Sequence, residues 1–263
     1  MSAAISKDGT RIAYERIGSG PPLILVDGAM CSRAFGPMPK IAALLAQHFT
    51  VYVYDRRGRG ESGDTQPYAK AREVEDIEAL IGAAGGSVFA VGLSSGAALA
   101  LEAAASSSRI QKLAVYEPPY MVDDLNFARV DHEGNLRALV AAGQRGAAIK
   151  YFMRMVNVPA PFIFMMQLMR GMWRKLKAVA HTLPYDMAIM GDWQIPAARL
   201  AKLATPTLAM YGGKTETRLR RAIEDLVKVL PNVRQQVLPG QTHNVNAAVL
   251  VPALVAFFKE SRA

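Results

Sequence analysis

Short hydrophobic runs alternate with amphipathic stretches along most of this chain. The runs 23–26 and 50–54 have no polar face, which is typical of strands buried on both sides within a parallel sheet. Between such runs, apolar residues recur at three- and four-residue spacing, which indicates amphipathic helices. We predict strands over 3–6, 11–17, 23–26, 50–54, 88–92, 112–116, 207–211 and 234–238, and helices over 38–47, 71–83 and 217–230, directly after Ser94, and at the end of the chain through Phe258.

This alternation stops between residues 120 and 204. The pattern there is helical throughout and indicates no strand. The segment holds both tryptophans and is rich in methionine, including Met153, Met155, Met165, Met166, Met169, Met172, Met187 and Met190. Strands that alternate with helices form a mostly parallel sheet with helices on both faces. We therefore predict an α/β fold with an eight-stranded core, formed by residues 1–119 and 205–263, and a helical cap inserted at 120–204.

The length suits either one large α/β domain or a core with an insertion. The chain has 263 residues, of which 51% are hydrophobic and 20% charged, so a large buried core is possible and disorder is not expected. Its one cysteine, Cys31, cannot form an internal disulfide, which fits a reducing compartment. The longest apolar run, 162–169, is too short to cross a bilayer, and residues 1–14 do not resemble a signal peptide. We expect a cytoplasmic protein without membrane insertion.

The formal net charge of +9 could indicate nucleic acid or an acidic membrane surface as a partner. The basic residues are, however, scattered along the chain. The two densest groups, 56–59 and 218–221, lack the interleaved aromatic residues on which bases stack. We therefore predict a solvated basic surface and no nucleic-acid partner.

One pentapeptide carries the strongest chemical signal. Gly92-Leu93-Ser94-Ser95-Gly96 stands between a predicted strand and an Ala/Leu-rich helix. A strand that turns at once into a helix strains the backbone of the middle residue, and glycines on either side avoid the resulting clashes. This turn would lift the Ser94 hydroxyl above the sheet. It would also place the Ser95 backbone N–H at a helix N-terminus, where it can stabilise an oxyanion.

The chain resembles the α/β-hydrolases over its whole length. The markers are 23–28, 55–62, 92–96 and the late His243, with the serine before the histidine as in that family. The resemblance implies Ser94 as nucleophile and His243, in the loop after the last strand, as the base that takes its proton. It also implies that the turn 55–62 is a structural loop held by ion pairs.

The resemblance implies an oxyanion hole formed by the backbone N–H groups of Ser95 and Ala29. Relatives often carry His-Gly before the second donor, whereas this chain has Asp27-Gly28. A backbone N–H donates whatever side chain its residue carries, so the hole can be intact. We interpret Asp27 as a hydrogen-bonding partner of its own loop, although a similar Asp-Gly loop occurs in some lactone-cleaving relatives. We interpret Cys31 as a buried, inert thiol.

The acid of the triad departs from the common pattern. Many relatives carry an aspartate shortly after the seventh strand, where this chain has Thr215 followed by Glu216. Glu117, directly after the sixth strand, is the other candidate, and some dehalogenases and lactone hydrolases of the family place a glutamate there. The fold puts that strand beside the strand that ends at Ser94. We predict that Glu117 orients His243, with Glu216 as the alternative.

These residues predict a serine hydrolase that cleaves an ester or lactone of a bulky apolar small molecule through an acyl-enzyme. The alternatives are carbon–carbon bond hydrolysis or haloperoxidase-like chemistry at the same site, and a ligand-binding or biosynthetic helper protein that has lost turnover. No metal-ligand spacing, phosphate-binding loop or dinucleotide fingerprint occurs, so we expect no cofactor. The oligomeric state and the natural substrate stay open.

Overall fold

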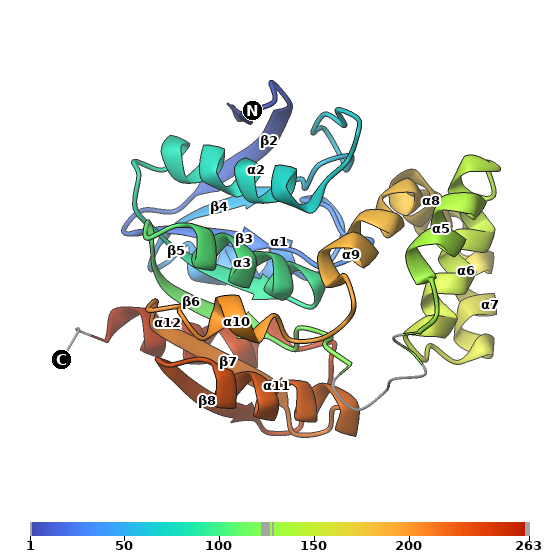
Figure 1. Cartoon of the computed structure of the whole chain (residues 1–263). Helices are drawn as coiled ribbons and strands as arrows, with labels where there is room; N and C mark the ends of the chain where they lie inside the picture. The colour runs from blue at the N-terminus through green and yellow to red at the C-terminus, as the bar shows by residue number, and fades with distance from the viewer. Residues whose placement is uncertain (1, 122–126, 128, 261–263) are drawn as a thin grey trace.

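The computed structural model describes residues 2–121, 127 and 129–260, and Figure 1 shows their arrangement. Eight strands form one sheet in the order β1-β2-β4-β3-β5-β6-β7-β8. The two pairings of β2 are antiparallel, and those from β4 through β8 are parallel. The strands are β1 (Ser2–Ile5), β2 (Arg11–Ile17), β3 (Pro22–Val26), β4 (Thr50–Tyr54), β5 (Val88–Leu93), β6 (Ile110–Tyr116), β7 (Thr207–Gly212) and β8 (Val233–Leu238). All eight predicted strands are confirmed, with ends that differ by one or two residues.

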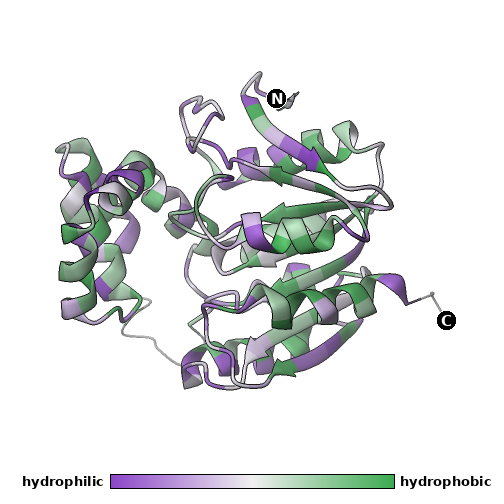
Figure 2. Ribbon diagram, turned by 180° about the vertical axis from the view of Figure 1, so that it is seen from behind, coloured by the Kyte–Doolittle hydropathy of each residue, from purple (hydrophilic) through white to green (hydrophobic). Residues whose placement is uncertain are grey.

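Helices cover both faces of the sheet. One face carries α1 (Met38–Leu45) and α12 (Ala247–Lys259), which pack against each other. The opposite face carries α2 (Lys70–Ala83), α3 (Ser95–Ser106) and α11 (Thr217–Val229). Because strand side chains alternate between faces, β3 contributes to two hydrophobic cores, Leu23 and Leu25 to the first and Ile24 and Val26 to the second. This explains why its sequence has no polar face, and Figure 2 shows hydrophobic colour along the central strands.

The predicted helical segment 120–204 has no strand in its described part, which leaves out 122–126 and 128. Its elements are α5 (His132–Ala141), α6 (Arg145–Met155), α7 (Ala160–Leu168), α8 (Arg170–Val179), a 3-10 turn (Ala180–Thr182), α9 (Leu183–Met190) and α10 (Ala197–Leu200). Figure 1 shows α5 to α8 as a group beside the sheet, joined to it through α9. Helix α9 packs on α3 and α2 of the core. The division of the chain at 119/120 and 204/205 stays a prediction.

The turn after β4 is buried and held by ion pairs, as the family resemblance implies, so only its assignment to a solvated basic surface is wrong. Arg56, Arg57 and Arg59 are each at most 1% exposed. Each guanidinium is paired with a buried carboxylate, which offsets the cost of removing the charge from water: Arg56 with Glu73, Arg57 with Asp76, and Arg59 with Asp186. Three of the cations counted toward the net charge are therefore structural. Within the described part of the chain, none of the helices is long and apolar enough to span a membrane.

Candidate active site

Ser94 stands at a sharp turn between β5 and α3. Its backbone has φ 55° and ψ −130°, a strained combination for a residue with a side chain. A Cβ at Gly92 would lie 2.6 Å from the Ala97 Cα, and one at Gly96 would lie 2.3 Å from the Val26 oxygen. Only glycine fits at both positions. The strained turn is thus fixed by its neighbours, as the pentapeptide predicts.

Three side chains from three loops meet beside this turn. The Ser94 Oγ lies 3.2 Å from Nε2 of His243, and Nδ1 of His243 lies 2.7 Å from Oε2 of Glu117. The three residues follow β5, β8 and β6, and β6 is the neighbour of β5 in the sheet. A serine, an imidazole and a carboxylate are therefore linked in one hydrogen-bonded chain. That arrangement can take a proton from the serine hydroxyl and stabilise the imidazolium that forms.

Contacts with β7 fix the position of the Glu117 carboxylate. The residue is fully buried, and its Oε1 accepts a hydrogen bond of 2.8 Å from the Gly212 N–H. Its own N–H donates to the Met210 oxygen at 3.1 Å, so β7 fixes both ends of the residue. The neighbouring Tyr116 hydroxyl donates to the Thr242 oxygen at 2.6 Å and thereby ties down the loop that carries the histidine. These contacts leave Oε2 directed at His243.

The alternative acid, Glu216, has a different partner. Its Oε2 lies 2.7 Å from the Arg218 Nε, and half of its side chain is exposed. Both residues lie on the wall of the cavity beside Ser94. The structure thus brings Glu117, rather than the residue after Thr215, to the imidazole.

Ser95 and Ala29, the two residues predicted to form an oxyanion hole, both line the cavity beside Ser94. Ser95 is the first residue of α3, so its N–H has no intrahelical partner. Ala29 follows Gly28 in the loop after β3, and both residues line the same cavity as Ser94. A Cβ at Gly28 would lie 3.0 Å from the Ser94 Cβ, so glycine there lets the loop pass close to the serine.

A cavity of about 510 Å³ opens above Ser94. Its walls come from the core loops and from the helical segment, and they are mostly apolar. Three of the methionines singled out in the sequence are on this wall, Met155, Met187 and Met190, together with Trp193. A larger hollow of about 900 Å³ lies beside the start of β6 and β7, but its lining residues include no histidine. Among the described residues, no group of three or more His, Cys, Asp or Glu side chains could hold a metal.

Comparison with known proteins decides the family. Residues 20–256 match the model of the alpha/beta hydrolase family. The chain belongs to this family. It is 50% identical to an alpha/beta hydrolase from Sphaerobacter thermophilus DSM 20745, with a TM-score of 0.91 over 98% of this chain and 100% of that one.

Two more distant structures share the hydrolase fold. A thermophilic esterase from Thermogutta terrifontis is 19% identical, with a TM-score of 0.76 over 98% of this chain and 96% of that one. The enol-lactonase from Burkholderia xenovorans LB400 is also 19% identical, with a TM-score of 0.76 over 98% of this chain and 100% of that one. At this identity the likeness concerns the fold.

Asp27 places a buried carboxyl group in the loop after β3 of the hydrolase. The residue is 5% exposed, and its Oδ1 accepts a hydrogen bond of 2.8 Å from the Gly28 N–H, as expected for a residue that stabilises its own loop. In the described part of the chain, Oδ2 has no hydrogen-bond partner. Burial raises the pKa of Asp27 to about 7, although the Gly28 N–H and the charge of Arg59 act in the opposite direction. Burial and the nearby Asp27 also raise the pKa of the Cys31 thiol, in line with an inert cysteine.

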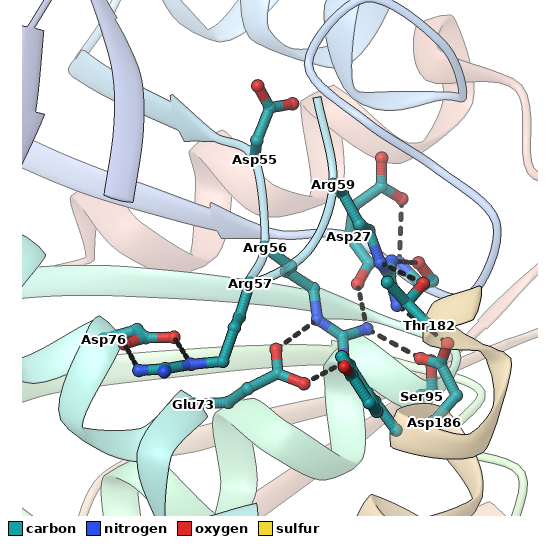
Figure 3. Close-up of polar contacts among 12 residues, drawn as sticks. Asp27, Asp55, Arg56, Arg57, Arg59, Glu73, Asp76, Ser95, Thr182 and Asp186 are labelled. Atoms are coloured by element: carbon teal, nitrogen blue, oxygen red, sulfur yellow. Dashed lines mark hydrogen bonds and ion pairs between the residues drawn. The ribbon is translucent and has the colours of Figure 1, made fainter. Parts of the chain in front are cut away.

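A buried charge network fastens this loop to α9 (Figure 3). The Arg56 Nη1 donates to the backbone carbonyl oxygen of Asp27 at 3.2 Å. The Arg59 Nη1 donates to the backbone carbonyl oxygen of Gly28 at 2.5 Å. Both arginines also bind Asp186 of α9, at 2.8 Å and 2.7 Å. Two guanidinium groups therefore connect two consecutive backbone oxygens of the loop after β3 to one carboxylate.

Asp186 also contacts Ser95, the residue that follows Ser94. Its Oδ1 accepts a hydrogen bond of 2.7 Å from the Ser95 hydroxyl. Burial disfavours its charge, but Arg59 and Arg56 outweigh that effect and hold the pKa of Asp186 below its usual value. Sequence reasoning missed this residue. The available signal was a lone carboxylate within the otherwise apolar stretch of α9.

Proposed function

We propose that this hydrolase cleaves a carboxylic ester or lactone of a bulky apolar small molecule through an acyl-enzyme intermediate. The observation that carries the proposal is the hydrogen-bonded chain from Ser94 through His243 to Glu117. It lies on the floor of a mostly apolar cavity, beside the N–H groups of Ala29 and Ser95. A serine relay at the base of an apolar cavity suits acyl transfer from an apolar substrate.

The reaction would begin with attack of the Ser94 Oγ on the substrate carbonyl carbon. The serine proton passes to Nε2 of His243, while the Nδ1–H donates to Glu117 and the carbonyl electrons move to the oxygen. The oxyanion is stabilised by the N–H groups of Ala29 and Ser95. Collapse of this intermediate expels the alcohol, which takes the proton from His243. Water, deprotonated by the same imidazole, then hydrolyses the acyl-serine.

The cavity wall favours an apolar acyl or alcohol group. Met155, Met187 and Met190 are flexible and polarizable, so they can adapt to an irregular hydrophobic ligand. We expect aromatic and long-chain p-nitrophenyl esters to have higher kcat/KM than the acetate. Equal rates for acetate and bulky esters would contradict an apolar binding cavity, and a panel of lactones beside linear esters would distinguish the two substrate classes.

The decisive experiment combines turnover with covalent labelling. A fluorophosphonate probe should label the wild-type protein at Ser94 and stop its hydrolysis of p-nitrophenyl esters. Ser94→Ala should lose labelling and about 10⁴-fold or more in kcat while keeping its circular dichroism spectrum. A Ser94→Ala variant with a tenth of wild-type activity would contradict the proposal. If the wild type shows no labelling and no turnover, the ligand-binding alternative is favoured.

A further inference from the structure

Helix α7 exposes an unusual amount of apolar surface. It has nine residues, and of these only Ile163 is buried. The exposed fractions reach 62% for Phe164 and 66% for Leu168. The other large apolar side chains exposed on this helix and at its end are Phe162, Met165 and Met169. A soluble monomer rarely leaves five large apolar side chains in one short segment in water, so this surface indicates a partner.

Helix α8 places positive charge next to this apolar surface. It packs against α7, and its buried residues are Leu176 and Val179. Its basic residues are exposed: Arg170, Arg174, Lys175 and Lys177. Between Glu133 and Asp186 the sequence contains no acidic residue. We call the outward surface of α7 and α8 the α7–α8 face. It combines aromatic and aliphatic side chains with the exposed guanidinium groups of Arg170 and Arg174, whereas the Lys175 ammonium lies over the Phe35 ring of the core at 5.7 Å.

We infer that the α7–α8 face docks on an anionic lipid surface. Interfacial helices place Phe, Leu and Met at the boundary of headgroups and acyl chains, with Lys and Arg at the anionic headgroups. Each basic residue near such a surface can contribute about fivefold to binding. The α7–α8 face provides both components side by side. Docking requires no spanning helix, so it is consistent with the short helices of this segment.

The charge pattern argues against a second copy of this chain as the partner. A two-fold interface would place the α7–α8 face against itself. Arg170 and Arg174 would then face a surface that is equally basic, without an acidic residue between Glu133 and Asp186 to pair with them. Like charges brought together in this way repel. An anionic surface removes that repulsion and accommodates the same apolar side chains.

The α7–α8 face adjoins the cavity of the active site. Phe152 and Met155 at the end of α6 line the cavity, as do Val156 and Val158 in the connection that leads into α7. Figure 1 shows α7 at the outer edge of the helical group, away from the sheet. Docking would therefore place an apolar wall of the cavity near the lipid, where apolar esters concentrate. Binding itself does not depend on turnover, so it can be tested apart from the proposed function.

The test is sedimentation of the full-length protein with vesicles. Phosphatidylcholine vesicles that contain phosphatidylserine should bind the wild type, and binding should weaken as salt is raised. Two variants probe the two components: the triple change Phe162→Ser, Phe164→Ser and Leu168→Ser, and the double change Arg170→Glu and Arg174→Glu. We expect each to lower binding by at least about tenfold. The charge variant should have no such effect on pure phosphatidylcholine vesicles.

Matched controls change the same residue types elsewhere. Ile5→Ser removes an apolar side chain that is 64% exposed at the sheet edge, and the double change Lys40→Glu and Lys202→Glu reverses two exposed charges outside the α7–α8 face. Both should bind vesicles like the wild type, and circular dichroism should show that all variants are folded. A wild type that stays in the supernatant with anionic vesicles would overturn the inference. So would a dimer in light scattering that only the triple serine variant disrupts.

Discussion

Helices α7 and α9 belong to the same helical segment, 120–204, and are similar in length and apolar content, yet they lie in opposite environments. In α7, only Ile163 is buried. In α9, seven of the eight residues are buried, and they are Leu183, Pro184, Tyr185, Asp186, Met187, Ile189 and Met190. An apolar composition therefore does not determine where a short helix lies.

The one carboxylate of α9 accounts for much of the difference. Asp186 binds Arg56, Arg59 and Ser95 in the core, whereas α7 has no charged residue. The pairings fix which face of α9 meets the core, and Met187 and Met190 of the same helix then line the cavity. Helix α9 thus forms part of the cavity wall beside Ser94, while α7 leaves all but one of its residues outside the core.

The largest effect is expected from removal of the carboxylate of α9. Asp186→Ala leaves Arg56 and Arg59 buried without their shared anion. The expected loss is about 3–5 kcal/mol in the free energy of unfolding, because a buried charge loses its partner. Urea unfolding measures it. Charge reversal elsewhere, at the exposed Lys202, serves as control, and a loss below about 1 kcal/mol would show that the network does not anchor α9.

The next effect depends on pH and concerns Asp27, whose loop Arg56 and Arg59 fasten. Burial raises the pKa of Asp27 to about 7 from 3.8. The folded state therefore retains this proton more strongly than the unfolded state. As pH rises from about 4 to about 7, ionisation of Asp27 lowers the free energy of unfolding of the protein. Asp27→Asn removes that loss. Relative to the wild type, the variant should gain about 4 kcal/mol in the free energy of unfolding across this window and nothing further above it.

The measurement is chemical unfolding of both proteins at a series of pH values. Only the difference between the two curves is used, so the titration of other groups cancels. A difference that stays constant from acid to neutral pH would mean that Asp27 ionises as easily in the folded protein as in the unfolded chain. The loop contacts of Gly28 and Arg59 would then outweigh burial.

A smaller effect is expected where α9 meets the substrate. Met187→Ala should cost about 2 kcal/mol in the free energy of unfolding, because the side chain is buried. It should also lower kcat/KM for bulky esters about tenfold while changing that for acetate much less. Steady-state kinetics on both esters measures this ratio. Met165→Ala on α7 is the matched control, and an equal effect of the two changes would contradict the assignment of α9 to the cavity wall.

The smallest effect is expected on α7 itself. Phe164→Ser removes an exposed side chain, so the free energy of unfolding should change by less than about 0.5 kcal/mol. Hydrolysis of soluble esters should not change either. Thermal and urea unfolding check the first expectation, and kcat/KM checks the second. A loss of more than about 2 kcal/mol would show that α7 is packed against the protein in solution.

The features that could be predicted from the sequence are those that depend on local patterns. Strands such as 50–54 and the turn around Ser94 depend on neighbouring residues, so alternation and glycine spacing are sufficient to recognise them. Glu117 could be identified as a candidate because Thr215 occupies the usual position of the acid. The order β3-β5-β6-β7 then places its strand where the family resemblance implies.

Contacts between distant residues could not be predicted in the same way. Arg56 and Asp186 are 130 positions apart in the chain, and nothing local in either segment indicates the other. The family resemblance implied ion pairs in the turn 55–62, but neither it nor the charge pattern indicated Asp186 as the partner of the group 56–59. The exposure of α7 is a similar case, because its apolar residues would equally suit a helix in the core. Burial is decided by tertiary packing, which a single sequence does not show directly.

A pair of amide variants tests whether Glu117 acts through His243 on Ser94. Glu117→Gln keeps the shape of the side chain but places an amide at the His243 Nδ1, which favours the wrong tautomer. We expect kcat for p-nitrophenyl esters to fall roughly 10⁴-fold in this variant, whereas Glu216→Gln should stay within about tenfold of the wild type. A crippled Glu216→Gln beside an active Glu117→Gln would contradict the account.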